Sequence, residues 1–279
     1  MAESFGARLV ARVREVGPLC VGIDPSADVL RSWGRDDDAV GLEFAALQLL
    51  EASLGVAAAI KPQVAYFERF GAAGYRVLER LFDEARSAEL FIVADAKRGD
   101  IGTTNDGYAE AWLRDGSPLA ADALTVSPYL GLGAMGGLLT QAAATGRGLF
   151  VVVSSSNPEG RPVQTARLET GERVEDGLLR QLAEANEGFD LLGPYGAVVG
   201  ATRQHSGFDF ENVRGPFLVP GVGAQGATPS DVGRLFARCV KGSVLVPVSR
   251  AITQAGPERR GLHDAARRYR DDLVDALLK

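Results

Sequence analysis

The stretch Leu90-Phe91-Ile92-Val93-Ala94-Asp95-Ala96-Lys97-Arg98-Gly99-Asp100-Ile101 joins a short apolar run to a cluster of charges. The apolar part, residues 90–94, is typical of a buried parallel strand. Asp95, Lys97 and Asp100 follow where this strand is predicted to end. Clustered charges at a strand end are unfavourable unless they neutralise one another or take part in chemistry. A lysine between two carboxylates stays protonated, which favours a proton donor over a base or a Schiff-base nucleophile.

Similar apolar runs recur along the whole chain and alternate with longer helix-like segments. The predicted strands are residues 19–23, 57–60, 90–94, 123–126, 149–153, 197–199, 217–219 and 244–248. The clearest predicted helices are residues 43–54, 74–86, 105–113, 175–185 and 229–238, the last beginning at the capping residue Thr228. Eight strand–helix units predict a single (β/α)8 TIM barrel that spans residues 1–279. An open, doubly wound sheet is the alternative, because a count of strands alone does not exclude it.

Composition indicates a soluble enzyme. The 279 residues are 46% hydrophobic and 24% charged, and the net charge of -6 gives no electrostatic reason to expect nucleic acid or an anionic membrane surface as a partner. No run reaches the roughly 18 apolar residues of a membrane span. Cys20 and Cys239 are predicted to be buried free thiols, which fits the reducing cytoplasm.

Polar residues follow most of the predicted strands, and a barrel brings the carboxyl ends of its strands to one rim. Asp24 follows the first strand, Lys61 the second and Ser156 the fifth. The glycine-rich stretch 220–226 follows the seventh, and Arg250 the eighth. Glycines let backbone N–H groups approach an anion, and a guanidinium can bind its oxygens in pairs. The last two loops therefore predict a phosphate site.

Three motifs in this order resemble a known family. They are Asp95-x-Lys97-x-x-Asp100-Ile101, then Pro220-Gly221-Val222-Gly223-Ala224-Gln225-Gly226, and finally Ser249-Arg250. Together they resemble orotidine 5'-monophosphate decarboxylase, in the longer bacterial (type 2) branch that carries Asp-Ala-Lys-Arg-Gly-Asp-Ile. The resemblance covers nearly the whole chain. It implies conversion of orotidine 5'-phosphate to UMP and carbon dioxide, the last step of de novo pyrimidine nucleotide synthesis, without a metal or another cofactor.

The resemblance also implies a role for each matching residue. Lys97 would donate the proton to C6 of the pyrimidine, and Asp95 would lie beside the departing carboxylate. Asp100 and Thr104 would reach the neighbouring site across a homodimer interface. The implied substrate-binding residues are Asp24 and Lys61 for the ribose hydroxyls, Ile101 and Pro220 for the pocket walls, Ser156 for the pyrimidine, Gln225 for base and phosphate, and Arg250 for the phosphate.

Other interpretations stay open at this stage. Asp-x-Lys-x-x-Asp also occurs in metal-dependent keto-sugar-phosphate decarboxylases and hexulose-phosphate synthases, but these place an acidic metal ligand near the end of strand two, where this chain has Lys61-Pro62-Gln63. A non-catalytic barrel that binds a phosphate ligand is a third possibility. Residues 157–174 are either a surface insertion or a lid. His205 and His263 are predicted to be surface residues rather than a metal pair.

Overall fold

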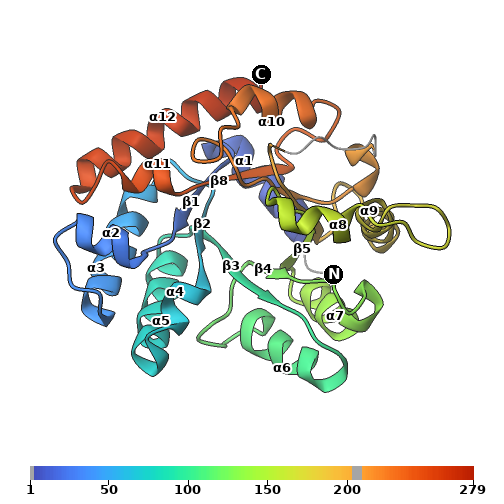
Figure 1. Cartoon of the computed structure of the whole chain (residues 1–279), viewed down its shortest axis with the longest axis horizontal. Coiled ribbons are helices and arrows are strands. Elements are labelled where there is room, and N and C mark those ends of the chain that lie inside the picture. The colour runs from blue at the N-terminus through green and yellow to red at the C-terminus, as the bar shows by residue number, and fades with distance from the viewer. Residues whose placement is uncertain (1–2, 203–208) are drawn as a thin grey trace.

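Eight parallel strands close into a barrel in the computed structural model, which describes residues 3–202 and 209–279. The strands follow one another around the barrel in chain order (Figure 1): β1 Leu19–Ile23, β2 Ala59–Pro62, β3 Phe91–Arg98, β4 Ala123–Val126, β5 Gly148–Ser154, β6 Tyr195–Val199, β7 Phe217–Leu218 and β8 Val244–Val248. Pairing of β1 with β8 closes the ring, with Leu19 opposite Val246 and Val21 opposite Val248. The predicted TIM barrel is thus confirmed, and the open sheet is wrong.

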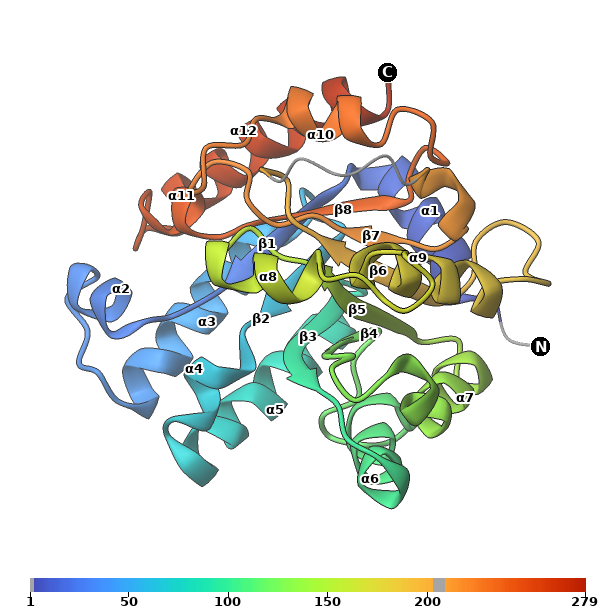
Figure 2. The same ribbon diagram turned by 45° about the vertical axis from the view of Figure 1, so that its right-hand side comes forward.

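The helices lie around the barrel, most of them on its outer side (Figure 2) and α1 against its amino-terminal end. They are α1 Phe5–Val16, α2 Ala27–Ser32, α3 Ala39–Ser53, α4 Val64–Glu68, α5 Gly71–Ser87, α6 Gly102–Leu113, α7 Gly136–Ala144, α8 Arg161–Gln164, α9 Val174–Ala185, α10 Pro229–Leu235, α11 Arg250–Thr253 and α12 Arg259–Leu277, with 3-10 turns η1 Leu132–Met135, η2 Pro158–Gly160 and η3 Phe210–Val213. Thr228 caps α10 as predicted, with reciprocal hydrogen bonds to Asp231. Among the described helices, none has the length and apolar character needed to cross a bilayer.

One predicted boundary is wrong in a way that matters for the site. Strand β3 was expected to end at Ala94, but it continues to Arg98. The sequence pattern misses this extension because charged residues rarely continue a buried strand. Asp95 and Lys97 therefore stand on the strand itself, and only Asp100 lies in the loop beyond it. The charges are held by the sheet rather than by a loop.

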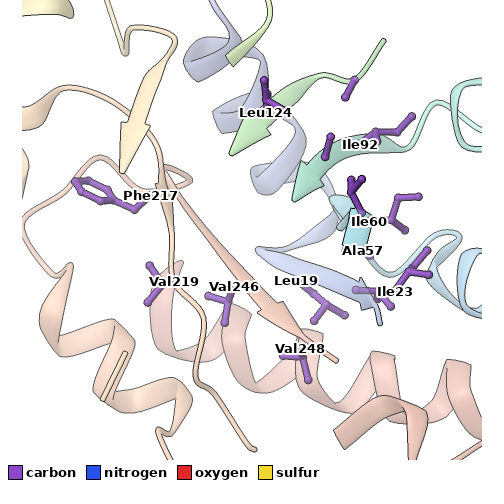
Figure 3. Close-up of a cluster of buried hydrophobic side chains, with 14 of the residues drawn as sticks. Leu19, Ile23, Ala57, Ile60, Ile92, Leu124, Phe217, Val219, Val246 and Val248 are labelled. Carbon is purple, nitrogen blue, oxygen red and sulfur yellow. The ribbon is translucent and has the colours of Figure 1, made fainter. Parts of the chain in front are cut away.

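Alternation of side chains along each strand separates two apolar layers. Residues such as Leu19, Ile60 and Val246 face the helices, and Figure 3 shows part of this outer cluster. A second cluster is formed by the alternating residues of the strands, among them Cys20, Ala59, Val93, Ala123, Phe150 and Leu245. Phe5 of α1 belongs to this second cluster and meets the ring of Phe150 edge-on, with centroids 5.8 Å apart. Helix α1 therefore packs against the amino-terminal side of the barrel interior.

Both cysteines carry free thiols. Cys20 is fully buried on β1, and this burial raises the pKa of its thiol to about 12. Cys239 is only half-buried, so the prediction of a buried thiol holds fully for Cys20 alone. His263 is half-buried and places Nδ1 3.2 Å from the Ala52 carbonyl oxygen, in contrast to the predicted surface position. His205 lies outside the described residues.

Candidate active site

A cavity of about 790 Å³ opens at the carboxyl ends of the strands. Eight of the eleven predicted site residues line it: Asp24, Lys61, Asp95, Lys97, Ser156, Pro220, Gln225 and Arg250. The alternation that builds the barrel interior explains this convergence. Two residues beyond Ala59 on β2 stands Lys61, and two beyond Val93 on β3 stands Asp95. The polar site therefore forms the next layer above the apolar interior.

The Asp95 carboxylate is the centre of the charged cluster. Its Oδ2 accepts a hydrogen bond from Lys61 Nζ at 2.7 Å and another from Gln63 Nε2 at 3.1 Å. Its Oδ1 accepts from Lys97 Nζ at 2.6 Å and from the Thr125 hydroxyl at 2.9 Å. Two ammonium groups and two neutral donors thus hold one carboxylate, which fixes both its charge and its orientation.

Burial and charge act in opposite directions on this cluster. Burial alone would raise the pKa of Asp95, but the ammonium groups of Lys61 and Lys97 outweigh it and hold that pKa well below its usual range. Burial would likewise lower the pKa of Lys61, but Asp24 and Asp95 together raise it well above its usual range. Asp24 lies 3.8 Å from Lys61 Nζ. Asp95 is ionised and Lys61 is protonated throughout the physiological range.

Lys97 has an unusual backbone. Its φ is +46°, in the left-handed region that non-glycine residues rarely adopt. The pairing of β3 with β4 is irregular at the same place, since its register shifts between Ala94 and Arg98. Such bulges occur beside active sites, where they redirect a side chain. Here the irregular segment carries Asp95 and Lys97 into the cavity wall.

The opposite wall comes from the loops after β5, β7 and β8. The Ser156 hydroxyl donates to Gln225 Oε1 at 2.7 Å, so these two loops touch above the cavity. Gly221, Gly223 and Gly226 all have positive φ, which explains why the β7 loop needs glycines. Arg250 is the exposed first residue of α11.

Three predicted site residues lie elsewhere. Asp100, Ile101 and Thr104 are not among the described residues that line the cavity. They stand around the start of α6, where Ile101 is 61% exposed and Thr104 is exposed. The Asp100 carboxylate accepts a hydrogen bond from the backbone N–H of Ile101 at 2.8 Å. Within one chain, the cluster of Asp95 and Lys97 is therefore separate from Asp100.

Comparisons with known proteins agree with the motifs. Residues 17–265 match the model of the orotidine 5'-phosphate decarboxylase / HUMPS family. The chain belongs to this family. It is 47% identical to a protein named orotidine 5'-phosphate decarboxylase in Streptomyces coelicolor, and 47% identical to one of the same name in Salinispora arenicola. Each alignment covers 99% of this chain and 99% of the relative.

Solved structures of the orotidine 5'-phosphate decarboxylase family also resemble this chain. One from Streptomyces avermitilis, described as a candidate enzyme of this name, superposes with a TM-score of 0.94 at 47% identity, covering 99% of this chain and 97% of the other. One from Toxoplasma gondii, described in the same way, gives 0.79 at 30% identity, covering 99% and 97%. The overall fold is thus shared with these solved structures.

Two cavity residues that hold the Asp95 carboxylate were not among the predicted site residues of this family member. Gln63 and Thr125 both line the cavity and both donate to Asp95. For Gln63 a signal existed, because it follows Lys61 by two residues and so faces the same way along the strand. Thr125 is a single hydroxyl in the apolar run Ala123–Val126, and its β-branched shape suits any strand.

Residues 157–174 form η2, α8 and an irregular stretch. The Gln164 side chain at the end of α8 joins them to the barrel: its Oε1 accepts from the backbone N–H of Ser155 at 3.2 Å, and its Nε2 donates to the Ser155 hydroxyl at 2.8 Å. The described residues that line the cavity include none from 157–174. Whether this segment acts as a lid therefore stays a prediction for this family member.

Removal of Asp95 is expected to destabilise the protein. Asp95→Ala leaves the buried ammonium of Lys61 without its nearest partner, and breaking such a buried pair costs about 3 kcal/mol. Folding lowers the pKa of Asp95, so its contribution is present above the unfolded value of about 4 and is lost as the pH falls below it. Urea denaturation at neutral pH measures the loss. Asp37→Ala, which breaks the exposed pair with Arg69, is the control. Equal losses in the two variants would contradict the expectation.

Proposed function

We propose that this chain converts orotidine 5'-phosphate to UMP and carbon dioxide, with residues 1–279 acting as one catalytic domain. The observation that carries the proposal is the buried Asp95 carboxylate held by Lys61 and Lys97 at the floor of the cavity. Full-length relatives of the same name at 47% identity support it. The proposal explains why the cluster is kept charged although burial opposes charge.

In the proposed reaction the bond between C6 and the carboxylate carbon breaks and its electron pair stays on C6. Carbon dioxide leaves, and a proton moves from Lys97 Nζ to C6, which gives UMP. Lys97 is then a neutral amine that regains a proton from water. The C6 carbanion is poorly delocalised, so fixed charge has to stabilise it. The ammonium of Lys97 is held in place for this purpose by Asp95 at 2.6 Å.

Asp95 favours the same step by its charge. A substrate carboxylate about 4 Å from it would be repelled by roughly 4 kcal/mol at an effective dielectric constant near 20. The repulsion disappears as neutral carbon dioxide forms. The same arrangement can be described as stabilising the transition state rather than as destabilising the bound substrate.

The remaining cavity residues suit a nucleotide. One oxygen of Asp24 is buried without a hydrogen-bond partner among the described residues, and a ribose hydroxyl would satisfy it beside Lys61. Ser156 and Gln225, which touch each other across the cavity, would contact the pyrimidine. Arg250 and Gln225 of the β7 loop would bind the phosphate, which supplies binding energy far from the reacting carbon, and Pro220 would form part of the pocket wall.

We further propose that the enzyme is a homodimer in which Asp100, Thr104 and Ile101 complete the neighbouring site. Ile101, Tyr129 and Leu130 are large apolar side chains exposed by 61%, 83% and 53%. Buried Asn105 joins their two loops, since it donates to the Ala134 carbonyl at 2.8 Å and accepts from the Asp100 N–H at 2.9 Å. An apolar surface of this kind fits a second copy of the chain, because a partner would cover it.

An assay of orotidine 5'-phosphate consumption by ultraviolet absorbance, with and without EDTA, tests the proposal. Rapid turnover that EDTA leaves unchanged is expected. The described residues contain no group of three or more His, Cys, Asp or Glu side chains able to hold a metal ion. No turnover by folded protein, combined with Mg²⁺-dependent turnover of a keto-sugar phosphate, would favour the metal-dependent alternative. UMP binding without any turnover would favour the non-catalytic barrel.

Arg250→Ala is expected to weaken UMP binding about 10- to 100-fold, because charged hydrogen bonds to the phosphate are lost. Uridine, which has no phosphate, should bind the variant as it binds the original protein. Calorimetric titration with both ligands measures the difference. Arg234→Ala is a matched control, since Arg234 is an exposed arginine on α10 that pairs with Asp231. If Arg250→Ala weakens the binding of UMP and of uridine equally, Arg250 does not bind the phosphate.

A further inference from the structure

Thr125 occupies an unusual position opposite the bulge of β3. The pairing runs Ala94 opposite Leu124 and then Arg98 opposite Val126. Asp95, Ala96 and Lys97 therefore face the single residue Thr125. In a regular ladder each residue would find a backbone partner, but this segment has more residues on β3 than β4 can pair. A side chain therefore has to provide the hydrogen-bond partner that the β4 backbone does not.

The hydroxyl of Thr125 fills this gap in both directions. It accepts a hydrogen bond from the backbone N–H of Lys97 at 3.0 Å and donates one to Asp95 Oδ1 at 2.9 Å. The direction is fixed, because an ionised carboxylate only accepts and an amide N–H only donates. Thr125 is 1% exposed, so no bulk water competes for its hydroxyl. One oxygen atom thus joins the carboxylate of Asp95 to the main chain of Lys97.

Lys97 needs such a support. Its backbone is in the left-handed region, which a non-glycine residue holds only when its surroundings enforce it. Its side chain is 51% exposed, in contrast to 9% for Asp95. A long, half-exposed lysine keeps one geometry only if its backbone and its ammonium group are both fixed. Thr125 fixes the first directly and the second through Asp95.

We propose that Thr125 is a positioning residue of the reaction, which sets the geometry of Asp95 and Lys97 through one buried hydroxyl. This inference rests on the proposed decarboxylation. Thr125 would act on the chemical step, because misplacing a reacting group slows the reaction without removing a binding contact. Nucleotide binding would depend instead on Asp24 and on the loops after β5, β7 and β8.

Three substitutions test the proposal. Thr125→Val keeps the β-branched shape and removes the hydroxyl, Thr125→Ser keeps the hydroxyl and removes the methyl group, and Thr125→Ala removes both. Valine and alanine should lower kcat about 10- to 100-fold while KM and the dissociation constant of UMP stay within about threefold. Serine should keep kcat within about threefold of the original value. Ser53→Ala is the control, since it removes a buried hydroxyl hydrogen bond on α3, remote from the cavity, and should leave kcat unchanged.

Several results would overturn the proposal. These are an unchanged kcat in Thr125→Val and Thr125→Ala, an equal loss in Thr125→Ser, or a loss of UMP affinity that parallels the loss of kcat. The last result would mean that Thr125 contacts the ligand itself. Circular dichroism checks the fold, and Thr125→Ala decides the question if the valine variant does not fold. If the original protein turns over orotidine 5'-phosphate and the Thr125 variants have the same kcat, this inference alone is overturned. If the folded original protein shows no turnover, the proposed function is overturned as well.

Discussion

Lys97→Ala is expected to lower turnover of orotidine 5'-phosphate about 10⁴-fold or more, because it removes both the proton donor and the cation that faces the carbanion. UMP affinity should change by less than about threefold, since the predicted contacts to ribose and phosphate come from other strands. Stopped-flow absorbance and calorimetric titration with UMP measure the two quantities. A large fall in kcat with retained binding would identify Lys97 as the acid.

The chain provides a matched control for this substitution. Lys241 is an exposed lysine before β8, at the opposite end of the barrel, where its ammonium group contacts the carbonyl oxygens of Leu278 and Lys279. Lys241→Ala should leave turnover unchanged. Unchanged turnover in Lys97→Ala as well would exclude Lys97 from the chemistry. A parallel loss of UMP binding would instead assign it to ligand binding.

Asp100→Ala is expected to lower turnover about 10³-fold although Asp100 lies outside the cavity of its own chain, because its charge would act in the neighbouring site. A shared site also predicts complementation. A heterodimer of Asp100→Ala with Lys97→Ala contains one site with both defects and one with neither. An equal, randomly assorted mixture should therefore recover about a quarter of the original activity.

Co-expression of the two variants with different affinity tags allows the heterodimer to be isolated, and because one of its two sites is intact it should show about half of the original activity. Each variant alone provides the baseline. Lys97→Ala mixed with itself, carried through the same purification, controls for the handling. If isolated heterodimers show no recovery, Asp100 does not act across an interface. If the chain is monomeric by sedimentation and fully active, the homodimer proposal is wrong.

Much of the barrel could be predicted because its strands are short apolar runs at regular spacing. The central exception is β3, where the strand continues through a bulge of charged residues and resumes its pairing with β4 at Arg98. Local propensity gives no sign of this, since the extension depends on Lys61 and Thr125 contributed by neighbouring strands. Helix α1 is also absent from the predicted elements, although Phe5, Leu9 and Val13 repeat every four residues.

The site residues likewise divide into those that the sequence predicts and those that it does not. Asp24, Lys61 and Arg250 were predictable because they follow strands, and a barrel brings such positions together. Thr125 was not, because its importance depends on a register shift between β3 and β4 that only the paired strands reveal. Nor does the sequence predict the left-handed backbone of Lys97, a conformation that normally selects glycine.

Helix α1 has a consequence for engineering this protein. Phe5, Leu9 and Val13 are fully buried at the amino-terminal side of the barrel, where Phe5 packs against Phe150. The charged cluster lies at the other end of the same strands. Substitutions that raise thermal tolerance often slow an enzyme when they stiffen its reactive centre. Improved packing beneath α1 would avoid this trade-off, because it would strengthen the barrel at the end where no bond is made or broken.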